Sequence, residues 1–235
     1  ETDRGLRQYS FLETVPVQGT VLKDTAGNIM TATLAEKLFS LAAVKAASFD
    51  MGGIGIEMEG GKPGWYDALN GLPGLMGSSV AETAELCRLI RFLREKLEAS
   101  GKDTEVMAEV YVLACDVTDI LGSYDDAFTR WQRLTTARED YREKIKTAAS
   151  GEKKIISAQD AVRMLSCWMK RAETALEEAR RKNGGLYPTY FAYDVTEYTK
   201  DAEGIHPASA KRVPMPLFLE GQVRCMRLPM TDESR

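Results

Sequence analysis

The chain has 235 residues, of which 44% are hydrophobic and 28% charged, a composition typical of a globular protein rather than a disordered or collagen-like one. Its 31 basic and 35 acidic side chains give a net charge of -4, and no strongly basic block predicts a nucleic-acid partner. Neither a membrane-spanning apolar run nor a signal-like start is seen, so we expect no membrane partner and a cytoplasmic location.

The chain contains four cysteines, at Cys87, Cys115, Cys167 and Cys225. They are far apart and form no C-x-x-C pair, whereas a structural zinc site needs closely spaced ligands. Three of them lie in segments with a helical pattern, where a small apolar side chain suits a core. We therefore expect reduced, buried thiols and no metal site.

The pattern of apolar residues predicts five helices, at 31–49, 79–100, 104–122, 124–149 and 157–182. Capping boxes, in which a hydroxyl and an acid three residues later bond to free backbone donors, mark four starts: Thr33/Glu36, Ser79/Glu82, Ser123/Asp126 and Ser157/Asp160. A fifth start lies at Asp103. The short connections predict antiparallel helical hairpins, which would cover less than half of a twelve-helix toroid.

Helical spacing in the last of these segments predicts that Met164, Trp168, Ala172 and Ala175 belong to the core. After Asn183 the period changes to alternation, and the apolar run 214–228 also predicts strands or an extended tail. Four aromatic residues could either wall an oligosaccharide groove or fill a buried strand face: Tyr187, Tyr190, Phe191 and Tyr193. Glu220 is either a site carboxylate or part of a salt bridge.

The connection 50–78 is the segment with the richest chemistry, and it holds nine glycines and two prolines. Compact domains seldom keep so long a connection unless it is functional or forms a packed Ω-loop, and both interpretations remain open. Trp65 and Tyr66 offer flat faces for a sugar ring. Four carboxylates are candidates for acid–base chemistry: Asp50, Glu57, Glu59 and Asp67.

Two other kinds of site find little support in the sequence. The glycines match neither the phosphate-binding loop G-x-x-x-x-G-K-[ST] nor the dinucleotide pattern G-x-G-x-x-G. A serine hydrolase is not expected, because no G-x-S-x-G is present and the sole histidine, His206, lies in a polar stretch typical of the surface.

The stretch GGKPGWYDALNGLPGLMGSSVAETAELCRLIRFL resembles the catalytic loop and following helix of the inverting phosphorylases of glycoside hydrolase family 94. Cellobiose and chitobiose phosphorylases carry D-W-N-D-G-M-N at this place, which aligns with residues 64–70. The resemblance implies that Asp67 is the general acid and that Trp65 lines a sugar subsite; Asn70 also matches. Tyr66, Glu57 and Glu59 are the further substrate-binding candidates.

Gly64 and Tyr66 replace an Asp and an Asn of the cellobiose enzymes, and the segment is closer to the β-1,2-oligoglucan phosphorylase branch. The tail PMPLFLEGQVRCMRL is also similar to the end of such proteins. Because these enzymes are several times longer, and this chain starts without Met, we expect it to be the C-terminal part of one. The rest of that polypeptide, or a second chain, would complete the barrel.

The resemblance implies a mainly α fold, with antiparallel hairpins forming part of an (α/α)6 toroid. A partial catalytic domain at 1–185 would carry the loop 50–78, and a C-terminal β-rich or extended segment would follow at 186–235. The implied activity is that of a hexosyltransferase-type phosphorylase, with oligosaccharide and orthophosphate as substrates and no cofactor. The resemblance leaves open whether the chain is active alone.

A phosphorylase needs one carboxylic acid, because orthophosphate is itself the nucleophile, and burial or a neighbouring acid would keep Asp67 protonated. The phosphate ligands cannot be matched; candidates are Arg4, His206, Lys211 and Arg212. Two alternatives stay open. One is a helical-barrel glycoside hydrolase or transglycosylase with Glu57 or Glu59 as base, and the other is a non-catalytic carbohydrate-binding helical domain.

Overall fold

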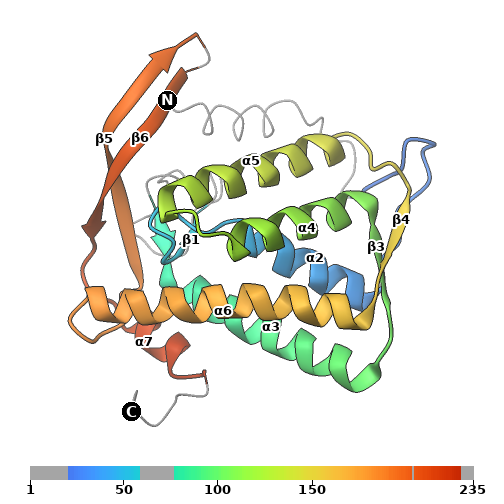
Figure 1. The fold of residues 1–235 in the computed structure, drawn as a ribbon, viewed down its shortest axis with the longest axis horizontal. Coiled ribbons are helices and arrows are strands. Elements are labelled where there is room, and N and C mark those ends of the chain that lie inside the picture. The colour runs from blue at the N-terminus through green and yellow to red at the C-terminus, as the bar shows by residue number, and fades with distance from the viewer. Residues whose placement is uncertain (1–20, 59–76, 203, 229–235) are drawn as a thin grey trace.

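The computed structural model describes residues 21–58, 77–202 and 204–228, and this part of the chain is mainly α-helical (Figure 1). Its helices are α2 (Leu34–Ala46), α3 (Val80–Ser100), α4 (Ala108–Gly122), α5 (Ala127–Ile145), α6 (Ala158–Lys182) and α7 (Leu219–Cys225). Its strands are β1 (Ile56–Glu57), β2 (Ser78–Ser79), β3 (Thr104–Met107), β4 (Lys153–Ile156), β5 (Tyr190–Asp201) and β6 (Gly204–Pro214). The five predicted helices correspond to α2 to α6, and the mainly α prediction is confirmed.

Three of the predicted capping boxes are half right. The hydroxyl half is confirmed at α2, α3 and α6, where the side chains of Thr33, Ser79 and Ser157 each accept the backbone N–H three residues later. The reciprocal half is wrong for α2 and α3, because tertiary partners take the acids. Glu36 accepts the N–H of Met107, and Glu82 pairs with Lys45.

The fourth box is wrong. Asp126, not Ser123, caps α5, since its carboxylate accepts the N–H groups of Phe128 and Thr129 at 2.9 and 3.0 Å. Ser123 donates instead to the carbonyl of Ile120 and so closes the end of α4. Residues 124–126 therefore form a turn, and α5 begins at Ala127.

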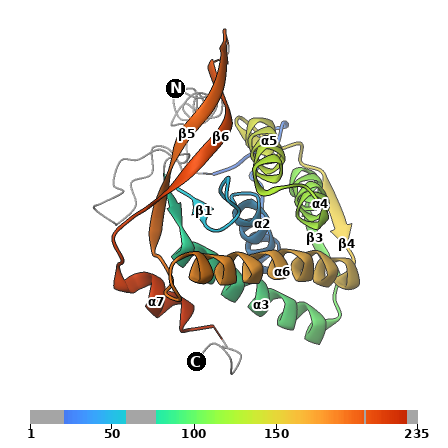
Figure 2. The same ribbon diagram turned by 60° about the vertical axis from the view of Figure 1, so that its left-hand side comes forward.

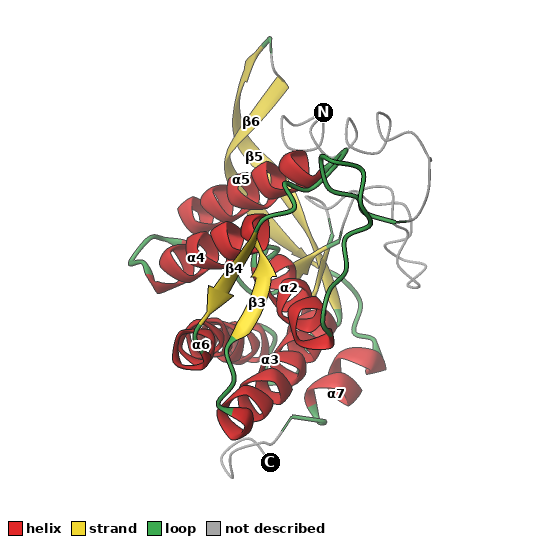
Figure 3. Ribbon diagram, turned by 90° about the vertical axis from the view of Figure 1, so that its right-hand side faces the viewer, coloured by secondary structure: helices red, strands yellow, loops and turns green. Residues whose placement is uncertain are grey.

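The predicted start of the helix at 104 is also wrong, because Thr104–Met107 form β3. This strand pairs antiparallel with β4, with Thr104 opposite Ile156 and Met107 opposite Lys153. The partner lies about fifty residues further along the chain, so no local pattern reveals the pairing. The antiparallel β3–β4 ribbon leads into α4 at one end and into α6 at the other, and it brings the start of α6 beside the end of α3 (Figure 3).

The helices pack as two pairs with α2 against both (Figure 1). The predicted antiparallel hairpin is confirmed for α4 and α5, which a short turn joins. α3 makes its most extensive contact not with α4 but with α6. α2 packs against α3 and α4, and its side chains Phe39, Ala42, Ala43 and Ala46 are fully buried.

An antiparallel sheet with the strand order β1-β2-β5-β6 stands beside the helices. β5 and β6 form a long hairpin, from Phe191 opposite Pro214 to Asp201 opposite Gly204. Its far end projects beyond the helices (Figures 1 and 2). At its near end β5 pairs with β2, so that Ser78 lies opposite Phe191. The alternation after residue 190 thus forms the predicted strand.

The run 214–228 is not wholly extended, since it contains α7, and the prediction is wrong for Leu219–Cys225. The spacing explains the difference: Gly221 and Cys225, four residues apart, are buried, whereas Leu219 and Val223 are exposed. The Gly221 N–H donates to Thr189 Oγ1 at 2.9 Å, which holds α7 against the chain before β5.

The core predictions hold where the structure tests them. Met164, Trp168, Ala172 and Ala175 are buried in one hydrophobic cluster. Phe191 and Tyr193 fill a buried strand face, while Tyr187 and Tyr190 are half-buried. All four cysteines are free; Cys87 and Cys225 are buried, but Cys115 and Cys167 are half-buried. None of the helices described here combines the length and apolar character that a membrane span needs.

Candidate functional site

The predicted catalytic segment is described only at its two ends. Five of the predicted site residues lie outside the described part of the chain: Glu59, Trp65, Tyr66, Asp67 and Asn70. Glu57 is described, and so are Asp50 at the start of the connection and Ser78 at its end. The structure therefore defines the geometry of the base of this segment, formed by its two ends.

The two ends of this segment are joined by the sheet. Glu57 of β1 lies opposite Ser78 of β2, and the N–H of Met58 donates to the carbonyl of Gly77 at 3.0 Å. Residues 58 and 77 are therefore adjacent in space although 19 positions apart in the sequence. The β1–β2 pairing therefore brings the two described ends of the connection together.

Asp50 is the centre of a buried hydrogen-bond cluster at this base. Its side chain is 2% exposed, and its carboxylate accepts five hydrogen bonds, from the backbone N–H of Gly52, Ile54 and Gly55 and from the hydroxyls of Ser78 and Tyr193. Burial raises the pKa of Asp50, and these hydrogen bonds act against that rise. One carboxylate thus links the turn before β1 to β2 and β5.

The local sequence explains why the chain turns around Asp50. Gly53 has a φ of +65°, a conformation that suits glycine, and its N–H closes the turn onto the carbonyl of Asp50 at 2.8 Å. Gly52 has no Cβ, and any side chain there would overlap the hydroxyl of Tyr193. The glycines of this part therefore serve close packing around one acid.

Glu57 joins the same base to helix α5. Its side chain is buried, and its two carboxylate oxygens accept from Trp131 Nε1 at 2.5 Å and Arg138 Nη1 at 3.0 Å. Arg138 is 1% exposed and also donates from Nε to Glu139 at 3.0 Å. Burial raises the pKa of Glu57, and Arg138 opposes that rise. The arrangement holds β1 in place and leaves both oxygens of Glu57 occupied.

Sequence reasoning did not identify three residues of this base: Trp131, Arg138 and Tyr193. They lie 74, 81 and 143 positions from their carboxylate partners. Arg138 stands in a strongly charged stretch of α5, where an arginine is normally solvated, so the sequence carries no signal of its burial. Tyr193 was recognised as an aromatic strand residue, but its bond to Asp50 was not.

The candidate phosphate ligands do not form one group in the described residues, and Arg4 lies outside them. His206 pairs with Asp201 at 2.8 Å near the far end of the β5–β6 hairpin. Arg212, near the other end, donates to the carbonyl of Lys182 at 3.3 Å and lies over the ring of Phe191. Lys211 is exposed.

Glu220 also finds its explanation in the structure. It forms an ion pair with Arg224 at 3.4 Å, one turn along α7, and it accepts a hydrogen bond from the hydroxyl of Tyr190 at 3.2 Å. The salt-bridge interpretation therefore applies to Glu220. The carboxylate holds α7 against β5.

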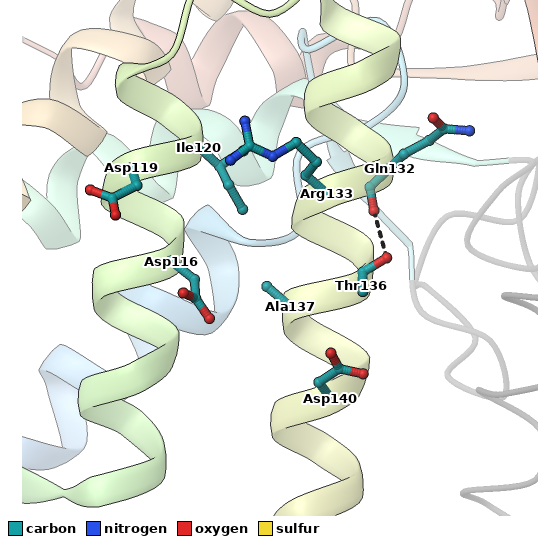
Figure 4. A pocket seen from close by; sticks show the side chains of 8 residues that line it. All are labelled: Asp116, Asp119, Ile120, Gln132, Arg133, Thr136, Ala137 and Asp140. Carbon is teal, nitrogen blue, oxygen red and sulfur yellow. Dashed lines mark hydrogen bonds between the residues drawn. The ribbon is translucent and has the colours of Figure 1, made fainter.

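A pocket of about 510 Å³ lies between α4 and α5 (Figure 4). Its walls carry three aspartates, Asp116, Asp119 and Asp140, together with Arg133, which pairs with Asp125. Burial raises the pKa of Asp116, and the other two aspartates add to the rise. None of the predicted site residues lines this pocket, so it is separate from the base of the loop.

The chemical role that suits this base is to hold the connecting segment in a fixed position. Both of its acids are buried and fully hydrogen-bonded, which suits fixing a loop more than transferring a proton. Within the described residues, no three His, Cys, Asp or Glu side chains are grouped so that they could hold a metal ion. No family model matches the chain, and no curated protein does either.

Proposed function

We propose that the chain is part of an inverting glycoside phosphorylase, which uses orthophosphate to cleave β-linked, most simply β-1,2-linked, gluco-oligosaccharides and releases α-glucose 1-phosphate. The observation that carries the proposal is the segment GKPGWYDALNGLPG at 61–74, with its resemblance to the family 94 loop. The firmly held base of this segment supports it, because a catalytic loop must present its acid in a fixed position.

In the proposed reaction, Asp67 acts as the general acid. It donates its proton to the departing glucoside oxygen while a phosphate oxygen attacks the anomeric carbon from the opposite face. The C1–O bond to the leaving sugar breaks, a C1–O bond to phosphate forms, and the configuration inverts from β to α. Proton exchange with phosphate or water restores Asp67. Trp65 would stack on the sugar ring, with Tyr66, Asn70 and Glu59 beside it.

The described residues support this division of labour. Both carboxylate oxygens of Glu57 are occupied, so we assign it to holding β1 rather than to contacting sugar. The same geometry favours phosphorolysis over the hydrolase alternative with Glu57 as base, because a base needs a free oxygen facing water. Asp50 would anchor the loop from its other side.

The larger assignments belong to the same proposal. The helical body at 1–185 would be part of an (α/α)6 toroid that a longer polypeptide or a second chain completes, and 186–235 would be its C-terminal segment. The α4–α5 hairpin supports this part of the proposal, because such a toroid consists of antiparallel helical hairpins. We also propose a cytoplasmic location, where the enzyme would have access to orthophosphate and to its oligosaccharide substrate.

Phosphorus NMR tests the activity directly. The chain, alone and with the remainder of its polypeptide, is incubated with phosphate and a panel of β-linked gluco-oligosaccharides, and the signal of a sugar 1-phosphate is followed. Its appearance supports phosphorolysis, and the productive linkage names the substrate. Sugar release that is indifferent to phosphate contradicts the proposal in favour of a hydrolase, and sugar binding without turnover contradicts it in favour of a binding domain.

Asp67→Asn tests the general acid. We expect phosphorolysis of an oligosaccharide to fall by about 10²–10⁴-fold, the usual worth of a positioned acid. A dinitrophenyl glucoside, whose leaving group needs no proton, should lose far less. The matched control is Asp119→Asn, an exposed position on α4, which should leave both rates unchanged. Equal losses on the two substrates, or none, would contradict the assignment.

A further inference from the structure

Two arginines from different helices lie near the turn that contains Gly53. Arg171 of α6 donates from Nη2 to the carbonyl of Gly53 at 2.6 Å. The same glycine faces Ala127, the first residue of α5, since a Cβ built on it would lie 3.7 Å from the Cβ of Ala127. Arg130 follows Ala127 by one helical turn, and it therefore lies on the side of α5 that approaches this turn.

Neither arginine has a carboxylate partner among the described residues. Their hydrogen bonds go to backbone carbonyls: that of Gly53 for Arg171, and that of Asp125, at 2.5 Å, for Arg130. The guanidinium of Arg171 also lies over the ring of Phe49, at 5.9 Å. The Nε atoms of both arginines are buried and have no hydrogen-bond partner in the described structure.

The nearest carboxylates are already engaged. Asp125 pairs with Arg133, Glu178 with Lys182, and the oxygens of Asp50 are occupied by its own five donors. These acids lie close enough to act at a distance but form no ion pair with Arg130 or Arg171. These two half-buried cations therefore have no carboxylate in direct contact among the described residues.

The surroundings of Arg171 disfavour its charged form, although Glu178 and Asp50 oppose this effect. Burial lowers its pKa, and the neighbouring charge of Arg130 lowers it further. Arg138 shows how the same fold treats an arginine with counter-charges: Glu57 and Glu139 contact it, and they raise its pKa against the effect of burial. An anion bound to both guanidinium groups would supply the contacting counter-charge that the described residues do not.

We propose that Arg130 and Arg171 bind an oxyanion of the phosphate type, held by their guanidinium N–H groups near Gly53. A guanidinium presents several donors in one plane, which match the oxygens of a phosphate. The site takes either free orthophosphate or the phosphate group of a sugar ester. It stands on the charges and contacts of α5 and α6 alone, and it would hold equally for a chain that performs no phosphorolysis.

Binding of inorganic phosphate to the full chain tests the site, by isothermal titration at an ionic strength kept constant with chloride. We expect saturable binding to the wild type, and Arg130→Gln and Arg171→Gln each to weaken it about tenfold, as a lost charge-assisted hydrogen bond does. Glucose 1-phosphate forms the second arm: tighter binding than phosphate identifies a sugar-ester site, and equal or weaker binding identifies free orthophosphate.

Arg163→Gln is the matched control, because Arg163 lies on α6, is exposed and pairs with Asp160. It should bind phosphate as the wild type does. The melting temperature gives a second readout: without phosphate, Arg130→Gln should be at least as stable as the wild type, because it removes the repulsion. A wild type that binds neither ligand, or a double variant that binds both unchanged, overturns the proposal. Because binding is read without turnover, the outcome is separate from that of Asp67→Asn.

Discussion

At the scale of single residues, the most informative side chain is Asp50. The sequence places it among four candidate carboxylates of a glycine-rich segment, and any of them could serve an acid–base role. In the structure its oxygens accept from three backbone N–H groups and two hydroxyls, all within a buried cluster. A carboxylate surrounded only by donors is an anchor, and its removal should be felt in stability.

We expect Asp50→Asn to lower the free energy of unfolding by about 2–4 kcal/mol. The asparagine amide places a donor where the aspartate accepted, so at least one of the N–H groups of Ile54 and Gly55 loses its partner. Urea denaturation measures the loss. Asp194→Asn, at an exposed position of β5, is the control and should change stability by less than about 0.5 kcal/mol. A buried variant as stable as this control would contradict the anchoring role.

At the scale of elements, the local sequence pattern predicts where helices form, but tertiary contacts set where some of them begin and end. Thr33, Ser79 and Ser157 cap as predicted, because an N-cap bond joins residues three apart in the sequence. The acids of the first two boxes bind partners on other elements instead. Glu36, for example, accepts a hydrogen bond from the backbone N–H of Met107. A pairing partner some fifty residues away likewise converts Thr104–Met107 from helix to strand.

Two substitutions at the start of α5 test which residue caps this helix. Asp126→Ala should cost about 1 kcal/mol of stability, since two N–H groups of the first turn lose their acceptor. Ser123→Ala should cost less, because its hydroxyl bonds only at the end of α4 and in the turn. Thermal or urea unfolding of both variants measures the difference. A larger loss for Ser123→Ala would restore the capping box that the sequence predicts.

At the scale of the whole molecule, one hydrophobic cluster contains Cys87 of α3 and Cys225 of α7, whose helices pack together. Burial raises the pKa of each thiol to about 12. Cys115 and Cys167 are half-buried, and burial raises their pKa as well. The four thiols therefore divide into two pairs by their accessibility.

We expect iodoacetamide at pH 8 to modify Cys115 and Cys167 first and to leave Cys87 and Cys225 unmodified until the chain unfolds. A thiol with a pKa of about 12 is about one part in ten thousand thiolate at that pH. Peptide mass spectrometry measures the order, with labelling in urea as the control for equal intrinsic reactivity. Early modification of Cys87 would contradict the packing of α7 on α3.

The raised pKa values of Cys87 and Cys225 also predict that the protein becomes less stable as the pH rises above 9. Between their ordinary value of 9.0 and about 12, the unfolded chain loses the protons of Cys87 and Cys225 while the folded chain keeps them. The contribution of these groups to stability is therefore fully present below pH 9 and falls as the pH rises through that window.

Particular residues show which features of the protein can be predicted from the sequence. Trp168 and Ala172 could be assigned to the core because they follow the helical spacing of apolar residues, which is visible in a short stretch of sequence. The helix α7 was missed, since a short apolar run of this length reads equally well as a strand. Of the predicted site, Glu57 alone is described, and its partners Trp131 and Arg138 lie on another element, where no local pattern marks them.

The sequence by itself determined the mainly helical fold, the core stripes and the hydroxyl caps of three helices, and it contains the glycine-rich segment on which the proposal of phosphorolysis depends. All of these depend on residues close together in the chain. Only the tertiary structure decided that the ends of the segment meet, that Asp50 and Glu57 are buried supports, and that Arg130 and Arg171 form no ion pair with a carboxylate of the described residues. Those features join residues of different elements, and such distant contacts are set by packing of the whole chain, not by local propensity.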